Sequence, residues 1–316
     1  MLNKSSDRKF TLALILSTAC WGLATVLSKG ILDYIPPLTL LVIQLTVSAC
    51  FLWAIVAFRR LRVPLGEQTF RLGLIGVLNP GLAYTFSLTG LMLTTASMST
   101  LIWAAEPILI LGLAWLILCE RLTRPLIVFS MIAMLGVFLV AGVDLTAGLH
   151  TSLLGNLLTL LGVGCCALYT VLTRRVVANV DPIVLVALQQ SFALIWALVI
   201  WSMELLRGEL PNLIAISSGM WVLAVASGIT YYGLAFWFYI IGLKKTPASL
   251  AGLFLNLIPI FGVGGAYIFL GERLAMVQWM GALLILTAVV STLRLRWGGV
   301  SDPPLPPARR SPIWRV

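Results

Sequence analysis

Charged residues and histidine are scarce in this sequence. Asp, Glu, Lys and Arg together make up 10% of its 316 residues, and the only histidine is His150. A lone histidine, with no paired carboxylates inside the apolar segments, provides neither a metal-ligand set nor a catalytic constellation. We therefore expect no metal, no cofactor and no enzymatic activity. An intramembrane enzyme would need several such groups at one depth of the bilayer.

Cysteine is also sparse. Cys20, Cys50, Cys119, Cys165 and Cys166 all lie within or at the end of apolar segments. Their spacing matches neither a zinc site nor a disulfide framework. We interpret them as small apolar residues.

Hydrophobic residues, in contrast, fill 60% of the chain, and the mean hydropathy is +1.04. A water-soluble domain of this size needs more polar surface, so the composition predicts an all-α integral membrane protein. A helix needs about 20 apolar residues to cross a bilayer. Runs of that length predict ten transmembrane helices, at 10–28, 37–58, 71–90, 96–118, 125–142, 153–173, 182–202, 219–242, 248–270 and 275–293.

The net charge of +10 is explained by how the 21 lysines and arginines are distributed. With ten spans and a cytoplasmic N-terminus, only Lys29, Arg207 and Arg273 lie outside. This asymmetry follows the positive-inside rule and predicts that both termini lie in the cytoplasm. We expect the protein to be located in the cytoplasmic (inner) membrane. The basic charge therefore gives no reason to expect a nucleic-acid partner.

A segment of the chain occurs twice. Residues 90–123 and 242–275 align at a constant offset of 152, sharing among others Pro107 with Pro259 and the Glu-Arg-Leu run that follows each helix. Five spans in each copy is an odd number, so the second copy must cross the membrane in the opposite direction. We predict two inverted five-helix repeats, 10–142 and 153–294, followed by an unordered proline-rich cytoplasmic tail, 297–316.

These features resemble the EamA family of the drug/metabolite transporter superfamily, which has ten spans in two repeats, with a central proline in each fourth helix and a glutamate at its end. The resemblance covers nearly the whole chain. It implies a central cavity and a secondary transporter that moves a small organic solute, such as an amino-acid-like metabolite, by alternating access, with export favoured. Uptake, a channel or scaffold role, and a monomer or a homodimer all stay open.

Two prolines lie at the middle of their spans. Pro107 in span four and Pro259 in span nine each remove one backbone hydrogen bond, which frees the carbonyls of Trp103 and Leu255 and kinks the helix. In a bilayer, such carbonyls need a protein or water partner. We expect both kinks to line the transport pathway; ordinary shaping of the helices is the alternative.

Glu106 is the only ionisable side chain deep in a span. A charge at this depth costs about 2.5–3.5 kcal/mol on insertion scales. Helical spacing puts Ser99, Trp103 and Glu106 on one stripe. The residue has two possible roles: proton coupling or substrate contact on one hand, a permanently protonated structural carboxyl on the other. The second copy has Ile258 at this position, so any such role is asymmetric.

Other polar and aromatic residues fall near the same depth. We expect the polar residues to face the interior of the bundle, where each could bind solute or join two helices, and Tyr84, Tyr232 and Trp21 to add aromatic walls. The residues of this set are Gln44, Gln189, Asn79, Tyr231, Asn256, Tyr84, Tyr232 and Trp21.

In each copy, one Glu-Arg pair follows the fourth span. Glu120 with Arg121, and Glu272 with Arg273, lie at opposite membrane surfaces in the predicted topology. Their positions favour a structural or gating contact, such as a salt bridge to a loop of the opposite half, over substrate binding. Small residues of the two fourth spans are expected to allow close helix packing: Gly112 and Ala114 in one, and Gly262, Gly264, Gly265 and Ala266 in the other.

Overall fold

The structure, a computed structural model, describes residues 4–32, 34–94, 96–141, 152–206, 216–269 and 275–297. These residues form helices and short turns. In chain order the elements are α1 (Lys4–Leu32), α2 (Pro37–Phe58), α3 (Glu67–Gly76), the π-helix η1 (Val77–Leu82), α4 (Ala83–Leu93), α5 (Ala96–Trp103), α6 (Glu106–Leu118), α7 (Arg124–Ala141), α8 (Leu153–Val176), the 3-10 turn η3 (Val177–Asn179), α9 (Pro182–Leu206), α10 (Ser218–Ser227), the π-helix η5 (Gly228–Leu234), α11 (Ala235–Leu243), α12 (Ala248–Leu255), α13 (Ile258–Phe269) and α14 (Met276–Trp297).

Within the described residues, nine helical segments are long and apolar enough to cross a membrane. The remaining predicted span, 96–118, is present as the two short helices α5 and α6. The all-α membrane fold predicted from the sequence is therefore confirmed. The tail beyond Trp297 lies outside the described residues, as do Glu272 and Arg273.

Polar residues and prolines mark where several helices begin. Ser152 Oγ accepts a hydrogen bond from Gly155 N at 3.4 Å at the start of α8, and Asp181 Oδ1 accepts one from Ile183 N at 3.0 Å at the start of α9. Pro37 opens α2, where a missing N–H costs nothing. The starts of these helices are thus fixed by side chains that accept hydrogen bonds from first-turn N–H groups, or by a proline that has no N–H group to satisfy.

Four spans are interrupted near their middle. In span three, Asn79 leaves the helical conformation (φ −147°, ψ 121°) within η1, and the corresponding part of span eight is η5. Span four stops at Trp103 and restarts at Glu106, and span nine stops at Leu255 and restarts at Ile258. The kinks predicted at Pro107 and Pro259 are therefore present as two-residue turns, in which Ala105 and Asn256 keep helical dihedral angles and bond three residues back, Ala105 N to Ile102 O at 3.1 Å and Asn256 N to Leu253 O at 3.3 Å.

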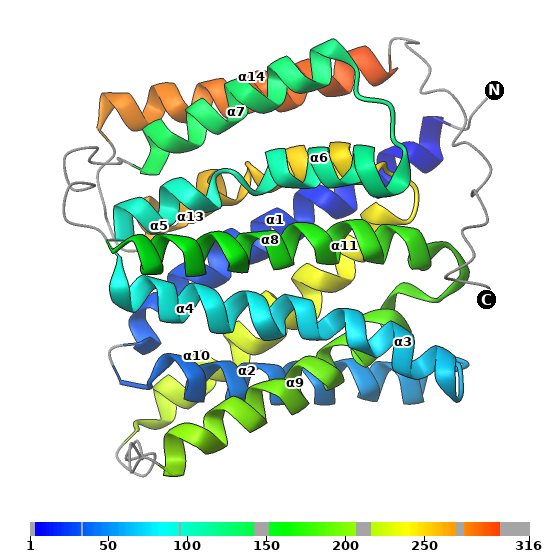
Figure 1. Cartoon of the computed structure of the whole chain (residues 1–316), viewed down its shortest axis with the longest axis vertical. Helices are drawn as coiled ribbons and strands as arrows, with labels where there is room; N and C mark the ends of the chain where they lie inside the picture. Colours follow the sequence, from blue (N-terminus) through cyan, green and yellow to red (C-terminus); the bar gives the residue numbers. More distant parts are fainter. Residues whose placement is uncertain are drawn as a thin grey trace.

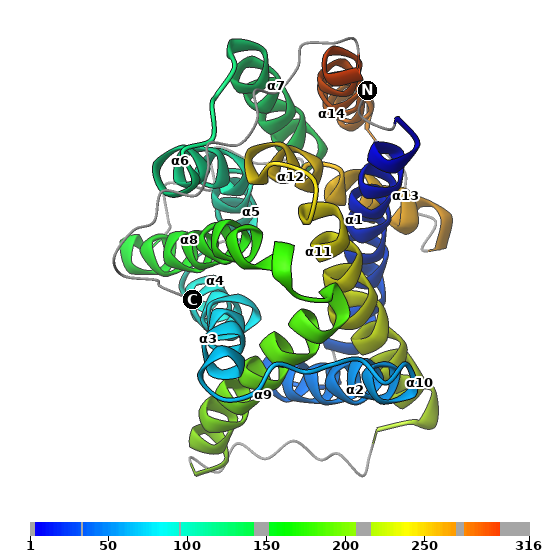
Figure 2. The same ribbon diagram turned by 90° about the vertical axis from the view of Figure 1, so that its right-hand side faces the viewer.

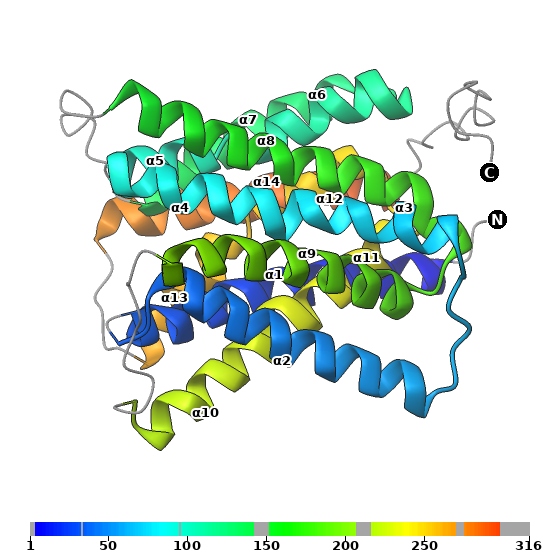
Figure 3. The ribbon, with the colours of Figure 1, turned by 60° about the horizontal axis from the view of Figure 1, so that its bottom comes forward.

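The helices run roughly side by side through the molecule (Figure 1). Seen from another side, α3 to α6 and α8 form one flank, and α1 with α10 to α13 forms the other (Figure 2). The packed pair α2 and α9 closes one edge between the flanks (Figure 3), and the pair α7 and α14 closes the opposite edge. Side chains of spans one, three, four, six, eight and nine therefore share the centre.

Apolar side chains cover the outer surface of the outermost helices. On the α7 and α14 pair, Met131, Leu135, Trp279 and Leu283 are about half exposed or more. Such a continuous apolar exterior is unfavourable in water and suits contact with lipid acyl chains.

Glycines allow the closest contacts between helices. A Cβ placed on Gly76 of α3 would lie 1.9 Å from the backbone oxygen of Gln189 in α9, and one on Gly228 of η5 would lie 2.9 Å from the backbone oxygen of Gln44 in α2. At Gly112, by contrast, and at its counterpart Gly264, an added Cβ meets nothing within 4 Å. The prediction that these two glycines allow close packing is therefore wrong, since their α-carbons face open space.

Replacing Gly76 with alanine should destabilise the protein by about 1–3 kcal/mol, because the methyl group collides with a rigid backbone. The expected result is a lower midpoint of thermal unfolding in detergent. Gly112→Ala is the matched control and should leave the midpoint unchanged or raise it, because a helical alanine is favoured over glycine. Equal stability of the two variants would contradict the packing described here.

Candidate functional site

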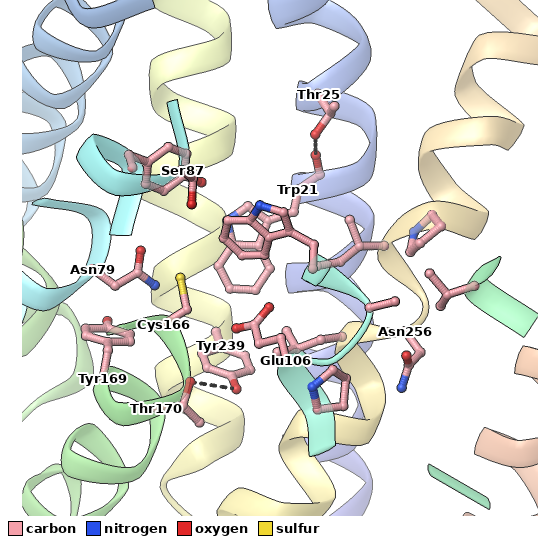
Figure 4. A pocket seen from close by; sticks show the side chains of 18 of the residues that line it. Trp21, Thr25, Asn79, Ser87, Glu106, Cys166, Tyr169, Thr170, Tyr239 and Asn256 are labelled. Atoms are coloured by element: carbon pink, nitrogen blue, oxygen red, sulfur yellow. Dashed lines mark hydrogen bonds between the residues drawn. The ribbon is translucent and has the colours of Figure 1, made fainter. Parts of the chain in front are cut away.

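A cavity of about 570 Å³ lies at the centre of the bundle (Figure 4). Volumes in this range are typical of sites for small molecules. Its walls come from α1, η1, α4, α5, α6, α7, α8, η5, α11 and the adjoining ends of α12 and α13. The lining residues are Trp21, Thr25, Asn79, Tyr84, Ser87, Leu88, Leu91, Ser99, Trp103, Ala104, Glu106, Pro107, Val137, Cys166, Tyr169, Thr170, Tyr231, Phe236, Tyr239, Leu255, Asn256, Ile258 and Pro259.

Glu106 is the first residue of α6 and lines the cavity where span four is broken. Its carboxyl group points toward the centre, and Trp21 and Tyr239 lie near it in this view (Figure 4). It makes no hydrogen bond or ion pair with any other described residue. The described lining contains no lysine, arginine or histidine. Glu106 is therefore an unpaired acidic group whose other titratable neighbours in the wall are Tyr84, Tyr169, Tyr231, Tyr239 and Cys166.

Two further polar atoms in the wall lack partners. Asn79 Oδ1 and Ser87 Oγ are buried and make no hydrogen bond with the protein. The extended backbone at Asn79 lies in the interruption of span three, which turns this side chain inward (Figure 4). Buried polar groups are normally paired, so these atoms have capacity to bind a solute or water.

Aromatic rings form much of the wall. Trp21 makes edge contacts with Phe236 and Tyr239, with ring centroids 5.2 and 5.3 Å apart. The hydroxyls of Tyr84 and Tyr231 are 2.6 Å apart and form a hydrogen bond between span three and span eight. These contacts hold the rings in place from both halves of the chain.

Eight of the residues predicted to contact a solute line the cavity: Glu106, Trp103, Ser99, Asn79, Tyr84, Tyr231, Asn256 and Trp21. Pro107 and Pro259 lie beside them. Within this group, Asn256 turns its Nδ2 to the backbone oxygen of Leu253 at 3.0 Å and away from Glu106 (Figure 4).

Three predicted residues, Gln44, Gln189 and Tyr232, do not line the cavity. Gln44 Nε2 donates to Ser227 Oγ at 2.7 Å and joins α2 to α10. Gln189 Oε1 accepts a hydrogen bond from Tyr169 OH at 2.9 Å and joins α9 to α8. Tyr232 is 3% exposed and packs against the rings of Tyr84, Tyr231 and Phe236. The amides of Gln44 and Gln189 thus join neighbouring helices, which was the alternative role for these two residues, whereas Tyr232 packs among aromatic rings.

The sequence prediction missed several lining residues, and the repeat could have found some of them. Spans one and six align at an offset of 145, and at this offset Trp21 corresponds to Cys166. At the offset of 152 that relates the later spans, Tyr84 corresponds to Phe236. Tyr169 and Thr170 were missed as well. Thr170 Oγ1 and Tyr239 OH lie 3.3 Å apart in the wall.

Glu120 forms a second notable contact, at one end of the bundle. Its carboxylate accepts hydrogen bonds from Ala248 N at 2.7 Å, Ser249 N at 3.0 Å and Ser249 Oγ at 2.6 Å, and the residue is 5% exposed. It therefore joins the first half of the chain to the first turn of α12, where a negative charge is favoured by the helix dipole. The contact is a helix cap and not a salt bridge. Arg121 next to it is exposed.

The backbone at Cys119 directs Glu120 to this partner. Cys119 has a left-handed conformation (φ 55°, ψ 31°), so α6 ends abruptly and Glu120 N reaches back to Ala114 O at 3.2 Å. Glycine is the residue that suits this conformation best. The corresponding residue of the second copy is Gly271 in the sequence.

The cavity extends away from Glu120. Ser87, Leu88 and Leu91 near the end of α4, and Ser99 in the first turn of α5, line it at the end of the bundle opposite to that where α6 ends and α12 begins (Figure 1). The contacts of Glu120 thus join the end of α6 to the start of α12 at one end of the bundle, and the cavity reaches toward the other end.

Comparison with known proteins places this architecture. An uncharacterised transporter of Archaeoglobus fulgidus is 25% identical over 90% of this chain and 99% of its own length. A probable amino-acid metabolite efflux pump of Escherichia coli is 26% identical over 92% of this chain and 97% of its own. A solved crystal structure shares the fold, with a TM-score of 0.77 and 20% identity over 95% of this chain and all of that one.

The family model described as the EamA-like transporter family matches residues 9–142 and again residues 153–294. Together the two matches cover most of the sequence, in agreement with the resemblance found in its repeated segments. This chain therefore belongs to the EamA-like transporter family and is a membrane transporter.

Proposed function

We propose that this protein is a secondary transporter that exports a small organic solute from the cytoplasm by alternating access through the central cavity. The observation that carries the proposal is that the cavity wall is built from equivalent positions of the two halves of the chain. Export is supported by the relatives in Escherichia coli and Salmonella typhimurium named as probable amino-acid metabolite efflux pumps.

The wall contains nine pairs of residues that the repeat relates, at an offset of 145 for spans one and six and 152 for the others. A carrier that works by alternating access has one central site, formed by both halves of the chain, that opens to each side of the membrane in turn. The pairs are Trp21/Cys166, Thr25/Thr170, Asn79/Tyr231, Tyr84/Phe236, Ser87/Tyr239, Trp103/Leu255, Ala104/Asn256, Glu106/Ile258 and Pro107/Pro259.

The packing of the helices supports the inverted arrangement of the repeats. Helix α1 packs against α11 and α13, and its counterpart α8 packs against α4 and α6, which correspond to α11 and α13. Exchanging the two halves therefore turns one set of contacts into the other. The glycine contacts behave in the same way, since Gly76 against Gln189 corresponds to Gly228 against Gln44.

Charge distribution supports a cytoplasmic location for the end of the bundle where α1 begins and α14 ends (Figure 1). Arg59, Arg71, Arg124, Arg175 and Lys245 all lie at helix ends on this side. By the positive-inside rule this side faces the cytoplasm. Glu120 lies on the same side, so in this proposal its contacts close the cytoplasmic end of the cavity.

Single-cysteine labelling tests this orientation. In a variant lacking the five native cysteines, His150→Cys or Gly208→Cys should react with a membrane-impermeant thiol reagent added outside intact cells. Arg62→Cys, between α2 and α3, should react only after the membrane is permeabilised. The reverse pattern would refute the orientation.

Glu106 is proposed as the coupling group. Its carboxyl is unpaired, so it can hold either a proton that enters from outside or a solute from the cytoplasm, and each would displace the other. This exclusion is what coupling of solute export to proton entry requires.

Reconstitution tests both the carrier and its coupling. Solutes should first be identified by comparing exported and retained metabolites in cells with and without the protein. In proteoliposomes the identified solute should show saturable uptake and counterflow, which a channel does not show.

Glu106→Gln should abolish accumulation driven by a pH gradient, whereas Glu67→Gln, which changes an exposed carboxylate paired with Arg71 at 2.5 Å, should not. Unchanged accumulation in Glu106→Gln would contradict the coupling role.

Glu120 is proposed as the cytoplasmic gate. Its three hydrogen bonds fasten α12 to the end of α6, so the cytoplasmic end can open only when they break. At the offset of 152, Glu272 corresponds in the sequence to Glu120, and Ala96 and Ser97 correspond to Ala248 and Ser249. We infer that the Glu272 contact forms at the outer end when the Glu120 contact breaks, so that one end is closed at a time.

Removing the Glu120 carboxylate should shift the population toward the cytoplasm-open state. Hydrogen bonds to a charged group contribute about 1.5–3 kcal/mol each, so a shift of about tenfold or more is expected for Glu120→Ala. The measurement is the rate at which Thr170→Cys, in the cysteine-free background, reacts with an impermeant reagent from the cytoplasmic side of inverted vesicles. Arg121→Ala should leave that rate unchanged. An unchanged rate in Glu120→Ala would refute the gate.

A further inference from the structure

We infer that the solute is an organic cation: an amine that carries a flat apolar group and lacks a carboxylate. The inference rests on the proposed function and specifies the substrate class of the same cavity. It differs from what the relatives' names would imply for this chain, because an amino acid carries both an ammonium and a carboxylate.

The charge of the cavity favours a cation over an anion. Glu106 is the only carboxyl group in the described wall, and no lysine, arginine or histidine lines the cavity to receive an anion. A substrate ammonium would pair with the Glu106 carboxylate in surroundings of low dielectric constant, where such pairing is strong. A substrate carboxylate would instead be buried without a cationic partner, which is unfavourable.

The unpaired polar atoms favour a hydrogen-bond donor. Asn79 Oδ1 is an acceptor without a partner, and Ser87 Oγ is free to accept as well. Both lie in the wall with Glu106 (Figure 4). An ammonium group has several N–H donors and no acceptor, so it can satisfy acceptors of this kind. A carboxylate, which only accepts hydrogen bonds, cannot satisfy Asn79 Oδ1.

The aromatic wall suits a cation with a flat apolar part. Trp21 and Tyr239, whose rings are in edge contact with each other, line the cavity with Glu106 (Figure 4), as do Trp103 and Phe236. Aromatic faces attract cations and also provide large apolar area for stacking. The volume of about 570 Å³ is sufficient for one small aromatic amine.

A set of three matched compounds tests the inference: 2-phenylethylamine, phenylalanine and 3-phenylpropionate. They share a phenylethyl group and differ in charge, as cation, zwitterion and anion. Binding to the purified full-length protein in lipid nanodiscs can be followed by tryptophan fluorescence excited at 295 nm, because Trp21 and Trp103 line the cavity and the phenyl compounds do not absorb there. Calorimetry provides an independent measurement.

We expect 2-phenylethylamine to bind at least about tenfold more tightly than phenylalanine, and 3-phenylpropionate not to bind, since one lost charge-assisted contact is worth about that factor. Glu106→Gln should lose this preference, and Glu106→Asp and Glu67→Gln should keep it. Equal or tighter binding of the zwitterion or the anion by the unmodified protein would overturn the inference, even if Glu106→Gln does not fold. So would the absence of amine binding.

Counterflow of the same compounds separates this inference from the proposed function. Counterflow of phenylalanine without binding of 2-phenylethylamine would support the proposed carrier function and refute the inference that the solute is a cation. Saturable, Glu106-dependent amine binding without counterflow of any solute would support the cation site and refute the carrier.

Discussion

A bilayer has no water to satisfy an unpaired backbone group, and this constraint determines where the transporter can keep its functional site. Spans three, four, eight and nine are all interrupted near their middle. The backbone groups that such breaks expose are tolerated only where they face protein or a hydrated cavity. All four interruptions therefore turn inward, and the residues beside them, including Asn79, Glu106, Tyr231 and Asn256, become cavity wall. The polarity of the cavity is thus a consequence of where the helices are broken.

Uninterrupted helices hold these broken ones in place. Spans two and seven supply rigid backbone against which Gly228 and Gly76 pack, and both glycines adjoin the π-helical segments of spans eight and three. Each close glycine contact thus lies beside a π-helical segment. The part of spans three and eight where the α-helical hydrogen bonds are interrupted is therefore held by direct contact with the backbone of α9 or α2. Gln44 and Gln189 reinforce this support through hydrogen bonds to neighbouring helices.

Much of this could be predicted from the sequence, since the length of an apolar run and the position of a proline each have a direct physical meaning. The runs gave the spans, Pro107 and Pro259 marked the interrupted helices, and the single deep carboxyl marked the cavity. Sequence patterns do not show which way a side chain turns. Gln44 and Glu106 are both polar residues within apolar spans, but Gln44 has Ser28 and Ser227 as partners on neighbouring helices, whereas Glu106 has none. The partner of Glu120 was also hidden, because a left-handed Cys119 and a helix 128 residues further along the chain are needed to form that contact.

The cavity is symmetric in construction and asymmetric in chemistry, and each property serves a different requirement. In the proposed mechanism, equivalent positions from the two halves would let either end close around the same central volume, as a carrier requires. A symmetric pair of carboxylates at Glu106 and its counterpart would place two like charges in one small cavity and would raise the cost of burying them. With Ile258 at the second position, one charge remains, and one proton or one cationic solute is sufficient to neutralise it. In the proposed mechanism, the loss of symmetry at this pair would set a stoichiometry of one proton or one cationic solute, while the symmetry of the other pairs would preserve access from both sides.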